Sequence, residues 1–347
     1  KEGAPVKVFA GGKTVAFVDF GEIPEQDVNR EPSIIVKSRG VIEFEYYDKP
    51  FSHKNEMWSY NARGKSVDIK YVYHLLKLNE LHFQKIGSKM QMPQIATPDT
   101  DKFEIPIPCP DNPKKSLEIQ AEIARILDAF TSLTAELTAE LTTRKKQYNY
   151  YRDKLLNFEE GQIEFVELRE LARNLDSMRR PITSGLRDHG DIPYYGASGV
   201  VDYVKDHIFD EDLLLVSEDG ANLVARNTPI AFSISGKSWV NNHAHVLRFE
   251  TYAEHRYVEF YLNSIDLTPY ISGAAQPKLN KKNLESIIIP NPSLEVKKQV
   301  VSVLDKFDTL INSITEGLPR EIKLRQKQYA YYRDQLLSFP KTEKAEA

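Results

Sequence analysis

The sequence has 347 residues, of which 41% are hydrophobic and 28% are charged, proportions typical of a chain that folds into globular domains with cores. It contains no apolar run long enough to span a bilayer. Its single cysteine, Cys109, excludes an internal disulfide and a structural zinc site built from several cysteines. A cytoplasmic location is the simplest interpretation. The net charge of −4 argues mildly against nucleic-acid binding, unless the 46 lysine and arginine residues gather in local patches.

The first 103 residues are rich in Gly, Pro, aromatic and β-branched residues in short alternating runs, such as Val15–Phe20 and Ser33–Val36. Runs of this kind are typical of strands. We therefore expect a globular, mainly β domain over residues 1–103, with one short helix at Ile69–Leu78. The chain begins at Lys1 without an initiator Met, which leaves the natural start of the protein open.

Residues 104–160 form the next segment, which opens with the Ile-Pro-x-Pro motif at residues 107–110. Its apolar residues recur three or four apart from Ile123 to Leu155, the spacing of a coiled-coil seam. We expect a long helix that starts at Pro113 or Ser116. Tyrosines here could stack on bases, but helix packing or subunit contact is favoured. The residues assigned to that helix or partner interface are Leu133, Leu137, Leu141, Tyr148, Tyr151 and Arg152.

Residues 161–288 repeat the character of the first domain, with predicted strands at Leu213–Ser217 and His245–Phe249 and a short helix at Ala253–Ser264. Tyr71-Val72 and Tyr257-Val258 are equivalent landmarks in the two short helices. Residues 163–192 precede the predicted strand at residues 193–196 of this second domain, but only residues 1–4 precede the comparable run at residues 5–8. The first domain is therefore expected to be incomplete at its N-terminus.

Residues 289–340 repeat the first helical segment and are followed by a tail at residues 341–347. Residues 144–158 read RKKQYNYYRDKLLNF and residues 325–339 read RQKQYAYYRDQLLSF, so eleven of fifteen positions are identical. Gly317-Leu318-Pro319 should break or kink this second helix. Because neither apolar seam is stable in water, we expect the two helices to pack on each other in antiparallel orientation. The interface residues expected in the second helix are Ile314, Tyr329, Tyr332 and Arg333.

The expected fold class is α+β: two globular, mainly β domains separated by two long antiparallel coiled-coil helices, with pseudo-two-fold symmetry. This order of segments, the KQYxYYRDxLL ending of each helix and the tandem Thr-Ala-Glu-Leu repeat at residues 134–141 resemble the specificity subunits of type I restriction–modification systems, and the IC group in particular. Residues 194–199 and 239–246 also look like target-recognition signatures. The resemblance covers the whole chain and is looser in the first domain.

The resemblance implies a division of labour. Each domain is a target-recognition domain that reads one half of a split sequence in double-stranded DNA, while the helices set the separation and carry two modification subunits. Those subunits methylate adenine with S-adenosylmethionine, and two restriction subunits, which are motor-nucleases, use ATP and magnesium. The specificity subunit itself binds no cofactor and catalyses nothing.

For DNA contact we favour basic and amide residues in the loops of the two domains. Each basic residue could instead be an ordinary solvated charge, and Asn241 and Asn242 could equally bond an adenine or cap a turn. The candidates are Lys13, Lys54, Arg63 and Lys65 in the first domain, and Ser198, Arg226, Lys237, Asn241, Asn242, His243, Lys278, Lys281 and Lys282 in the second.

Other kinds of site are weakly supported. His243 and His245 lie two apart in a predicted strand and would share one face, but no third metal ligand is evident, so a structural or DNA-facing role is favoured. Three Gly-Lys-Ser/Thr triplets lack the first glycine of a phosphate-binding loop. Asp68-Ile69-Lys70 fits half of a nuclease motif, but such triplets are common by chance. No Asn/Asp-Pro-Pro-Tyr/Phe methyltransferase motif is present.

The main alternative to a DNA reader is a coiled-coil scaffold whose two domains bind proteins. The domains have diverged while the helices have not, which favours two domains that read different half-sites. Since many acidic residues lie in the predicted helices, including Glu136, Glu140 and Asp305, basic residues are left for the domains. We therefore expect the isolated chain to bind DNA weakly and with sharp salt dependence.

Overall fold

A computed structural model describes residues 3–64, 66–89, 91–159, 161–226, 228–273 and 276–339. The chain divides into two compact units. Unit 1 comprises Lys1–Thr138 with Glu321–Ala347, and unit 2 comprises Ala139–Arg320. None of the helices in these described stretches is both long enough and apolar enough to cross a membrane. The expected tail at residues 341–347 lies outside the described residues.

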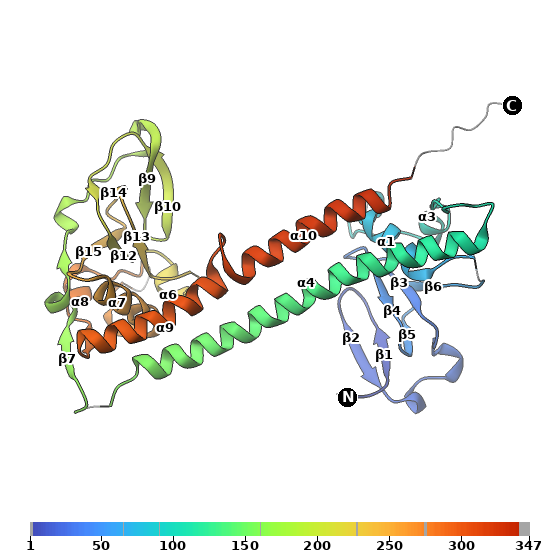
Figure 1. Ribbon diagram of the computed structural model, residues 1–347, viewed down its shortest axis with the longest axis horizontal. Coiled ribbons are helices and arrows are strands. Elements are labelled where there is room, and N and C mark those ends of the chain that lie inside the picture. The colour runs from blue at the N-terminus through green and yellow to red at the C-terminus, as the bar shows by residue number, and fades with distance from the viewer. Residues whose placement is uncertain are drawn as a thin grey trace. The chain divides into compact units, whose positions relative to one another are not determined.

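The first domain, within unit 1, contains two small sheets with strand orders β2-β1-β5 and β4-β3-β6 (Figure 1). Three helices follow the strands, and the helix predicted at Ile69–Leu78 is found at those bounds. The elements are β1 (Val6–Phe9), β2 (Val15–Val18), η1 (Phe20–Glu22), η2 (Glu25–Asp27), β3 (Ser33–Lys37), β4 (Glu43–Tyr47), β5 (Phe51–His53), β6 (Met57–Asn61), α1 (Ile69–Leu78), α2 (Glu80–Gly87) and α3 (Thr97–Asp101).

The second domain, within unit 2, contains sheets with orders β10-β9-β14-β11 and β13-β12-β15-β8, and a two-stranded pair β16-β7. Its elements are β7 (Glu164–Glu167), α5 (Leu168–Leu171), β8 (Arg173–Asn174), η3 (Asp176–Met178), η4 (Ser184–Leu186), β9 (His189–Gly196), β10 (Gly199–Val204), β11 (Phe209–Asp210), β12 (Leu213–Ser217), α6 (Asn222–Ala225), β13 (Ala231–Ile234), β14 (Lys237–Val240), β15 (Ala244–Arg248), α7 (Tyr252–Ser264), η5 (Thr268–Tyr270), α8 (Lys281–Glu285) and β16 (Ile288–Asn291).

The two domains share one strand topology. In the first, β1 pairs in parallel with β5, and β3 lies between β4 and β6. In the second, β9 pairs in parallel with β14, and β12 lies between β13 and β15. A helix then follows each central sheet, α1 with the buried Tyr71 and α7 with the buried Tyr257. The domains are therefore diverged copies of one fold, as the repeat predicts.

The two helical repeats differ in continuity. The first is one helix, α4 (Pro113–Leu156), of which residues 113–138 belong to unit 1 and residues 139–156 to unit 2. The second is α9 (Leu294–Asn312) followed by α10 (Gly317–Leu336). The break precedes Gly317, which has a φ of 74° and lies so close to the last turn of α9 that a Cβ atom would be 2.4 Å from the Thr309 carbonyl oxygen. The sequence predicted this break. Ile314, which we expected at a helix or partner interface, does not pack between the helices, because it lies in the break and is 82% exposed.

Within each unit, α4 packs antiparallel to the second helical repeat. In unit 1 the ring of Phe130 stacks on Tyr332 at 5.4 Å, and Ile123 and Leu127 share a core with Leu337. In unit 2 the repeat-equivalent pair, Tyr151 and Phe307, stacks at 5.8 Å. Residue numbers rise along one helix as they fall along the other. The same aromatic contact is thus made twice with the roles of the two helices exchanged.

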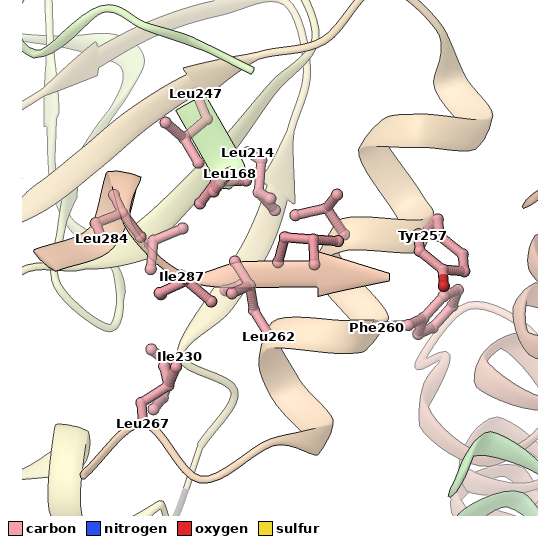
Figure 2. Packing of buried hydrophobic residues seen from close by; sticks show 14 of the residues in the cluster. Leu168, Leu214, Ile230, Leu247, Tyr257, Phe260, Leu262, Leu267, Leu284 and Ile287 are labelled. Carbon is pink, nitrogen blue, oxygen red and sulfur yellow. The ribbon is translucent and has the colours of Figure 1, made fainter. Parts of the chain in front are cut away.

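The larger core of unit 2 lies between the central sheet, α5, α7, α8 and α9. Figure 2 shows Leu168 of α5 beside Leu214 and Leu247, with Leu284 and Ile287 nearby. Leu168 is only 1% exposed although it lies on a helix of four residues. This side chain helps to fix the segment from β7 to β8, whose strands also pair with β16 and β15.

We expect Leu168→Ala to lower the free energy of unfolding by about 2–5 kcal/mol, because it removes a buried leucine and leaves a cavity. Leu186→Ala is the matched control, since Leu186 is 77% exposed and its truncation should change stability by less than about 0.5 kcal/mol. Urea unfolding monitored by circular dichroism measures both. Equal midpoints for the two variants would contradict this assignment.

Candidate nucleic-acid interface

The strand topology brings two turns of the first domain to one edge. Because β1 and β5 run in parallel, the turns that follow them begin at the same edge of the sheet, and the backbone N–H of Lys54 donates to the carbonyl of Phe9 at 3.1 Å. Lys13 lies in the first turn and Lys54 in the second. Both side chains are exposed and neither bonds another described residue. They are available to bind phosphate or base edges.

Arg39 belongs to the same edge and was missed in the sequence. It follows β3, and the hydroxyl of the preceding Ser38 donates to the carbonyl of Glu56 in the turn of Lys54. Arg39 is exposed, and its Nε lies 3.2 Å from the sulfur of Met92. We name Lys13, Arg39 and Lys54 the first loop edge. Three cations on adjacent turns form a local basic patch in a chain with a net charge of −4.

The second domain has the corresponding edge. The parallel pairing of β9 with β14 places the turn of Ser198 beside the turn at residues 241–243, and the N–H of Asn241 donates to the carbonyl of Tyr195 at 3.0 Å. Ser198, Asn242 and His243 are exposed there, and we name them the second loop edge. Asn241 is buried, and its Oδ1 accepts from the N–H of His243 at 2.8 Å. Of its two roles, Asn241 therefore caps the turn, while Asn242 faces solvent.

The expectation that His243 and His245 share one face of a strand was wrong. β15 begins at Ala244, so His243 lies in the preceding turn, where its Nδ1 is 2.9 Å from Asp219. His245 is buried, with Nδ1 2.6 Å from Asp176 and Nε2 2.6 Å from the carbonyl of Leu279. Both of its ring nitrogens face hydrogen-bond acceptors, so neither offers a lone pair to a metal.

Asp176 and Glu218 stand beside His245 with ligand atoms close enough to suggest a cation site. Cationic side chains already fill this cluster, because Arg179 contacts Glu218 at 2.6 Å and Lys278 contacts it at 2.9 Å. Burial alone would raise the pKa of the Asp176 carboxyl, but the hydrogen bond from His245 holds it below its ordinary value. The cluster is a closed network of ion pairs that joins four segments of the domain.

Several other DNA candidates have structural partners instead. Lys278 belongs to the network just described. The guanidinium of Arg226 donates to the carbonyl of Asn263 at 3.0 Å, and with Arg152 it lines a cavity next to α7 and α9. Lys281 lies 3.6 Å from Glu285. Arg63, Lys237 and Lys282 are exposed without a partner among the described residues, and Lys65 lies outside those residues.

The short helix of each domain is anchored to a long helix by equivalent charge pairs. In unit 1, Lys70 of α1 contacts Asp128 of α4 at 2.6 Å. In unit 2, Arg256 of α7 contacts Asp305 of α9 at 2.8 Å. Asp68, two positions before Lys70, accepts hydrogen bonds from two backbone N–H groups at the start of α1. The Asp68-Ile69-Lys70 triplet is therefore a helix cap and an anchor, not half of a nuclease site.

Comparison with known proteins decides the family. The chain matches the type I restriction modification DNA specificity domain over residues 14–144 and 160–324. It belongs to the type I DNA specificity family. It is 40% identical over 296 residues to the Escherichia coli EcoR124I/EcoR124II specificity subunit, covering 79% of this chain and 72% of that protein. It is 39% identical over 262 residues to the Escherichia coli EcoprrI specificity subunit, covering 72% of this chain and 63% of that protein.

The fold agrees with this assignment. The crystal structure of a type I restriction–modification S subunit from M. genitalium superimposes with a TM-score of 0.66 over 99% of this chain and 91% of that chain, at 17% identity. Specificity subunits recognise DNA sequence and are not catalytic, and this chain belongs with them.

The family repeat also duplicates a partly exposed aromatic surface. The guanidinium of Arg152 lies over the ring of Tyr148 at 5.6 Å, and Arg333 lies over Tyr329 at 5.7 Å. Next to these pairs, Tyr151 and Tyr332 are 43% and 45% exposed. Leu133, Leu137 and Leu141 are partly buried on α4. We name residues 148–152 and 329–333 the paired tyrosine surfaces.

We expect Lys54→Ala in the first loop edge to weaken binding of the assembled specificity complex to all DNA sequences alike, and to reduce the salt slope of log K by about 1, because one phosphate contact is lost. Lys298→Ala on α9 is the control and should leave the slope unchanged. Fluorescence anisotropy with labelled duplexes at several salt concentrations measures this. An unchanged salt slope for Lys54→Ala would show that Lys54 makes no phosphate contact.

We expect the stability of the second domain to depend on pH through His255, the neighbour of the anchor residue Arg256. His255 is buried with its Nε2 2.8 Å from the hydroxyl of Ser233, and burial together with the neighbouring Arg256 lowers its pKa to about 4. An unfolded histidine takes up a proton near pH 6.5. The unfolded state therefore binds more protons between these values, and stability falls as pH drops from about 6.5 to 4, by about 2–3 kcal/mol.

Urea unfolding at pH 7 and pH 4.5 tests this, with His255→Gln as the comparison. The variant has no group to titrate at this position, so its midpoint should fall less than that of the parent chain. The same fall in both proteins would show that His255 does not control the decline.

Proposed function

We propose that this chain is the sequence-recognition subunit of a type I restriction–modification complex, in which each domain reads one half of a bipartite site in double-stranded DNA. The observation that carries the proposal is the repeated unit: one strand topology and equivalent anchors on long helices, but different chemistry at the loop edges. The turns of Lys13 and Lys54 in the first domain correspond to the turns of Ser198 and of Asn242 and His243 in the second, and Arg39 corresponds to Asp219. Different side chains on one frame suit readers of two different sequences, and they disfavour a scaffold that binds one partner twice.

We further propose that the paired tyrosine surfaces each dock one modification subunit. Two nearly identical surfaces fit two copies of one partner, and partly exposed aromatic and arginine side chains are enriched at protein interfaces. The modification subunits would supply adenine methylation with S-adenosylmethionine, and two restriction subunits would supply ATP- and magnesium-dependent cleavage. Because the substrate is chromosomal or invading DNA, we place the complex in the cytoplasm.

The charge distribution is consistent with weak binding by the isolated chain. The carboxylates of Asp128 and Asp305 on the long helices are occupied by Lys70 and Arg256, so part of the negative charge is neutralised within the protein. Few cations remain on the loop edges, and the partner subunits would add further phosphate contacts. Affinity of the chain alone should therefore fall steeply as salt rises.

Methylation mapping tests the proposed function. The full-length protein is expressed with its modification subunit in a host without adenine methylation, and methylated adenines are located by sequencing. We expect one bipartite motif, with two short specified blocks separated by unspecified bases. A stable complex that methylates nothing, or a single continuous motif, would contradict the proposal.

The length of α4 should set the spacer. Insertion of one further Thr-Ala-Glu-Leu unit after Leu141 lengthens the helix by about 6 Å and turns it by about 400°. Since DNA rises about 3.4 Å per base pair, we expect the unspecified spacer to grow by about one or two base pairs while both half-sites stay the same. Methylation of the parental spacing by the insertion variant would contradict this role, and a four-residue insertion in the loop of residues 161–163 is the control.

A further inference from the structure

The imidazole of His243 is held in a fixed orientation at the second loop edge. The backbone N–H of His243 donates to Oδ1 of Asn241 at 2.8 Å, and its carbonyl accepts from the N–H of Glu218 at 2.9 Å. The ring nitrogen Nδ1 lies 3.0 Å and 2.9 Å from the two carboxylate oxygens of Asp219. The backbone and the ring are thus both tied to neighbouring segments, while 51% of the side chain stays exposed.

The contact with Asp219 decides which ring nitrogen carries the proton. An ionised carboxylate only accepts hydrogen bonds, so a neutral His243 keeps its single proton on Nδ1 and donates it to Asp219. The other nitrogen, Nε2, is then an acceptor. It bonds none of the described residues, and it lies on the side of the ring away from Asp219. The second loop edge therefore presents a directed acceptor.

The first domain has the opposite chemistry at the same two positions. The parallel strand pairs make Lys54 the equivalent of His243, and the isolated pairings that follow the central strands make Arg39 the equivalent of Asp219. Lys54 and Arg39 only donate hydrogen bonds, which suits contacts with phosphate oxygens. A pair of donors in one copy of the fold is thus replaced by a pair that presents an acceptor in the other copy.

An acceptor at this place restricts what His243 can bind on DNA. Phosphate oxygens are themselves acceptors, so neither Nε2 nor the carboxylate of Asp219 forms a hydrogen bond with the DNA backbone. In the major groove, the donors are the N6 amino group of adenine and the N4 amino group of cytosine, whereas guanine and thymine present acceptors. A neutral His243 on this turn is therefore suited to a base contact, and only to a base with an amino group.

We propose that His243 is a specificity-determining residue of the second domain, and that its Nε2 accepts a hydrogen bond from the amino group of an adenine or a cytosine in the major groove. Asp219 is the positioning residue, because it fixes both the proton and the orientation of the ring. This inference rests on the proposed function, and it names the class of base at one position of one half-site.

Methylation mapping with His243→Ala locates the contact. The full chain is expressed with its modification subunit in a host without adenine methylation. We expect one specified position in one block to become degenerate, while the other block and the spacer are retained. His189→Ala is the matched control, because His189 is an exposed histidine at the opposite end of β9, and it should leave the motif unchanged. A parent complex that methylates no bipartite motif would count against the proposed function, whereas a bipartite motif that His243→Ala leaves unchanged would overturn this inference alone.

Base analogues test the hydrogen bond itself. Purine in place of adenine, or 2-pyrimidinone in place of cytosine, removes only the amino group, and each is placed at every specified position except the methylated adenine. Fluorescence anisotropy at pH 8 measures binding of these duplexes by the complex. At one position, we expect loss of the amino group to weaken binding by the parent about three- to tenfold and to leave binding by His243→Ala unchanged.

The role of Asp219 has its own readout. Asp219→Ala should reduce the effect of amino-group loss at the same position, because the ring is no longer fixed, while its urea unfolding midpoint stays close to that of the parent chain. Equal effects of the analogues on the parent and on His243→Ala at every position would overturn the proposal. A requirement for the purine N7 atom in place of the amino group, measured with 7-deazapurines, would overturn it as well, because it would show that the imidazole donates.

Discussion

The contact on which the rest of the protein depends is the buried packing of the short helix of each domain on a long helix, which is accompanied in both repeats by an ion pair. Asp128 holds Lys70 and Asp305 holds Arg256, at equivalent positions of the two repeats. Arg256 is largely buried and also contacts Glu259 at 2.7 Å, so removal of one partner would leave an unpaired charge in a nearly dry site. A rigid anchor of this kind fixes the orientation of each domain on its helix, and therefore the direction in which its loop edge faces.

The two repeats agree at their anchors and differ at their loop edges because anchors and loop edges have different physical constraints. An anchor residue has a fixed partner in the same chain, so its replacement is costly. A loop-edge side chain such as Lys13 or Asn242 has no partner among the described residues, while the turn that carries it is fixed by backbone bonds such as that from Lys54 to Phe9. The side chains on these turns can thus change with little effect on the fold, which is what a family of readers with many specificities requires.

Local and periodic features of the fold were predictable from the sequence. The helix α1 was predicted at its observed bounds, and the break before Gly317 follows from glycine and proline chemistry. Side-chain partners were not predictable, because they depend on residues distant in the chain: Glu218 holds Lys278, and Asn263 holds Arg226. A difference of one residue in the start of β15 moved His243 from a strand to a turn, since the side chain of Asn241 forms that turn. Arg39 has no motif and is recognised only once β3 and its neighbouring turns are placed.

The central claim is that two domains on equivalent anchors read DNA independently. Its most direct test exchanges residues 161–288 for the corresponding domain of a family member with a different target, keeps both long helices, and maps methylated adenines in cells. The account predicts a motif in which one specified block changes to that of the donor, while the other block and the spacer are retained. A motif altered in both blocks, from a chimaera that still assembles and methylates, would contradict independent reading.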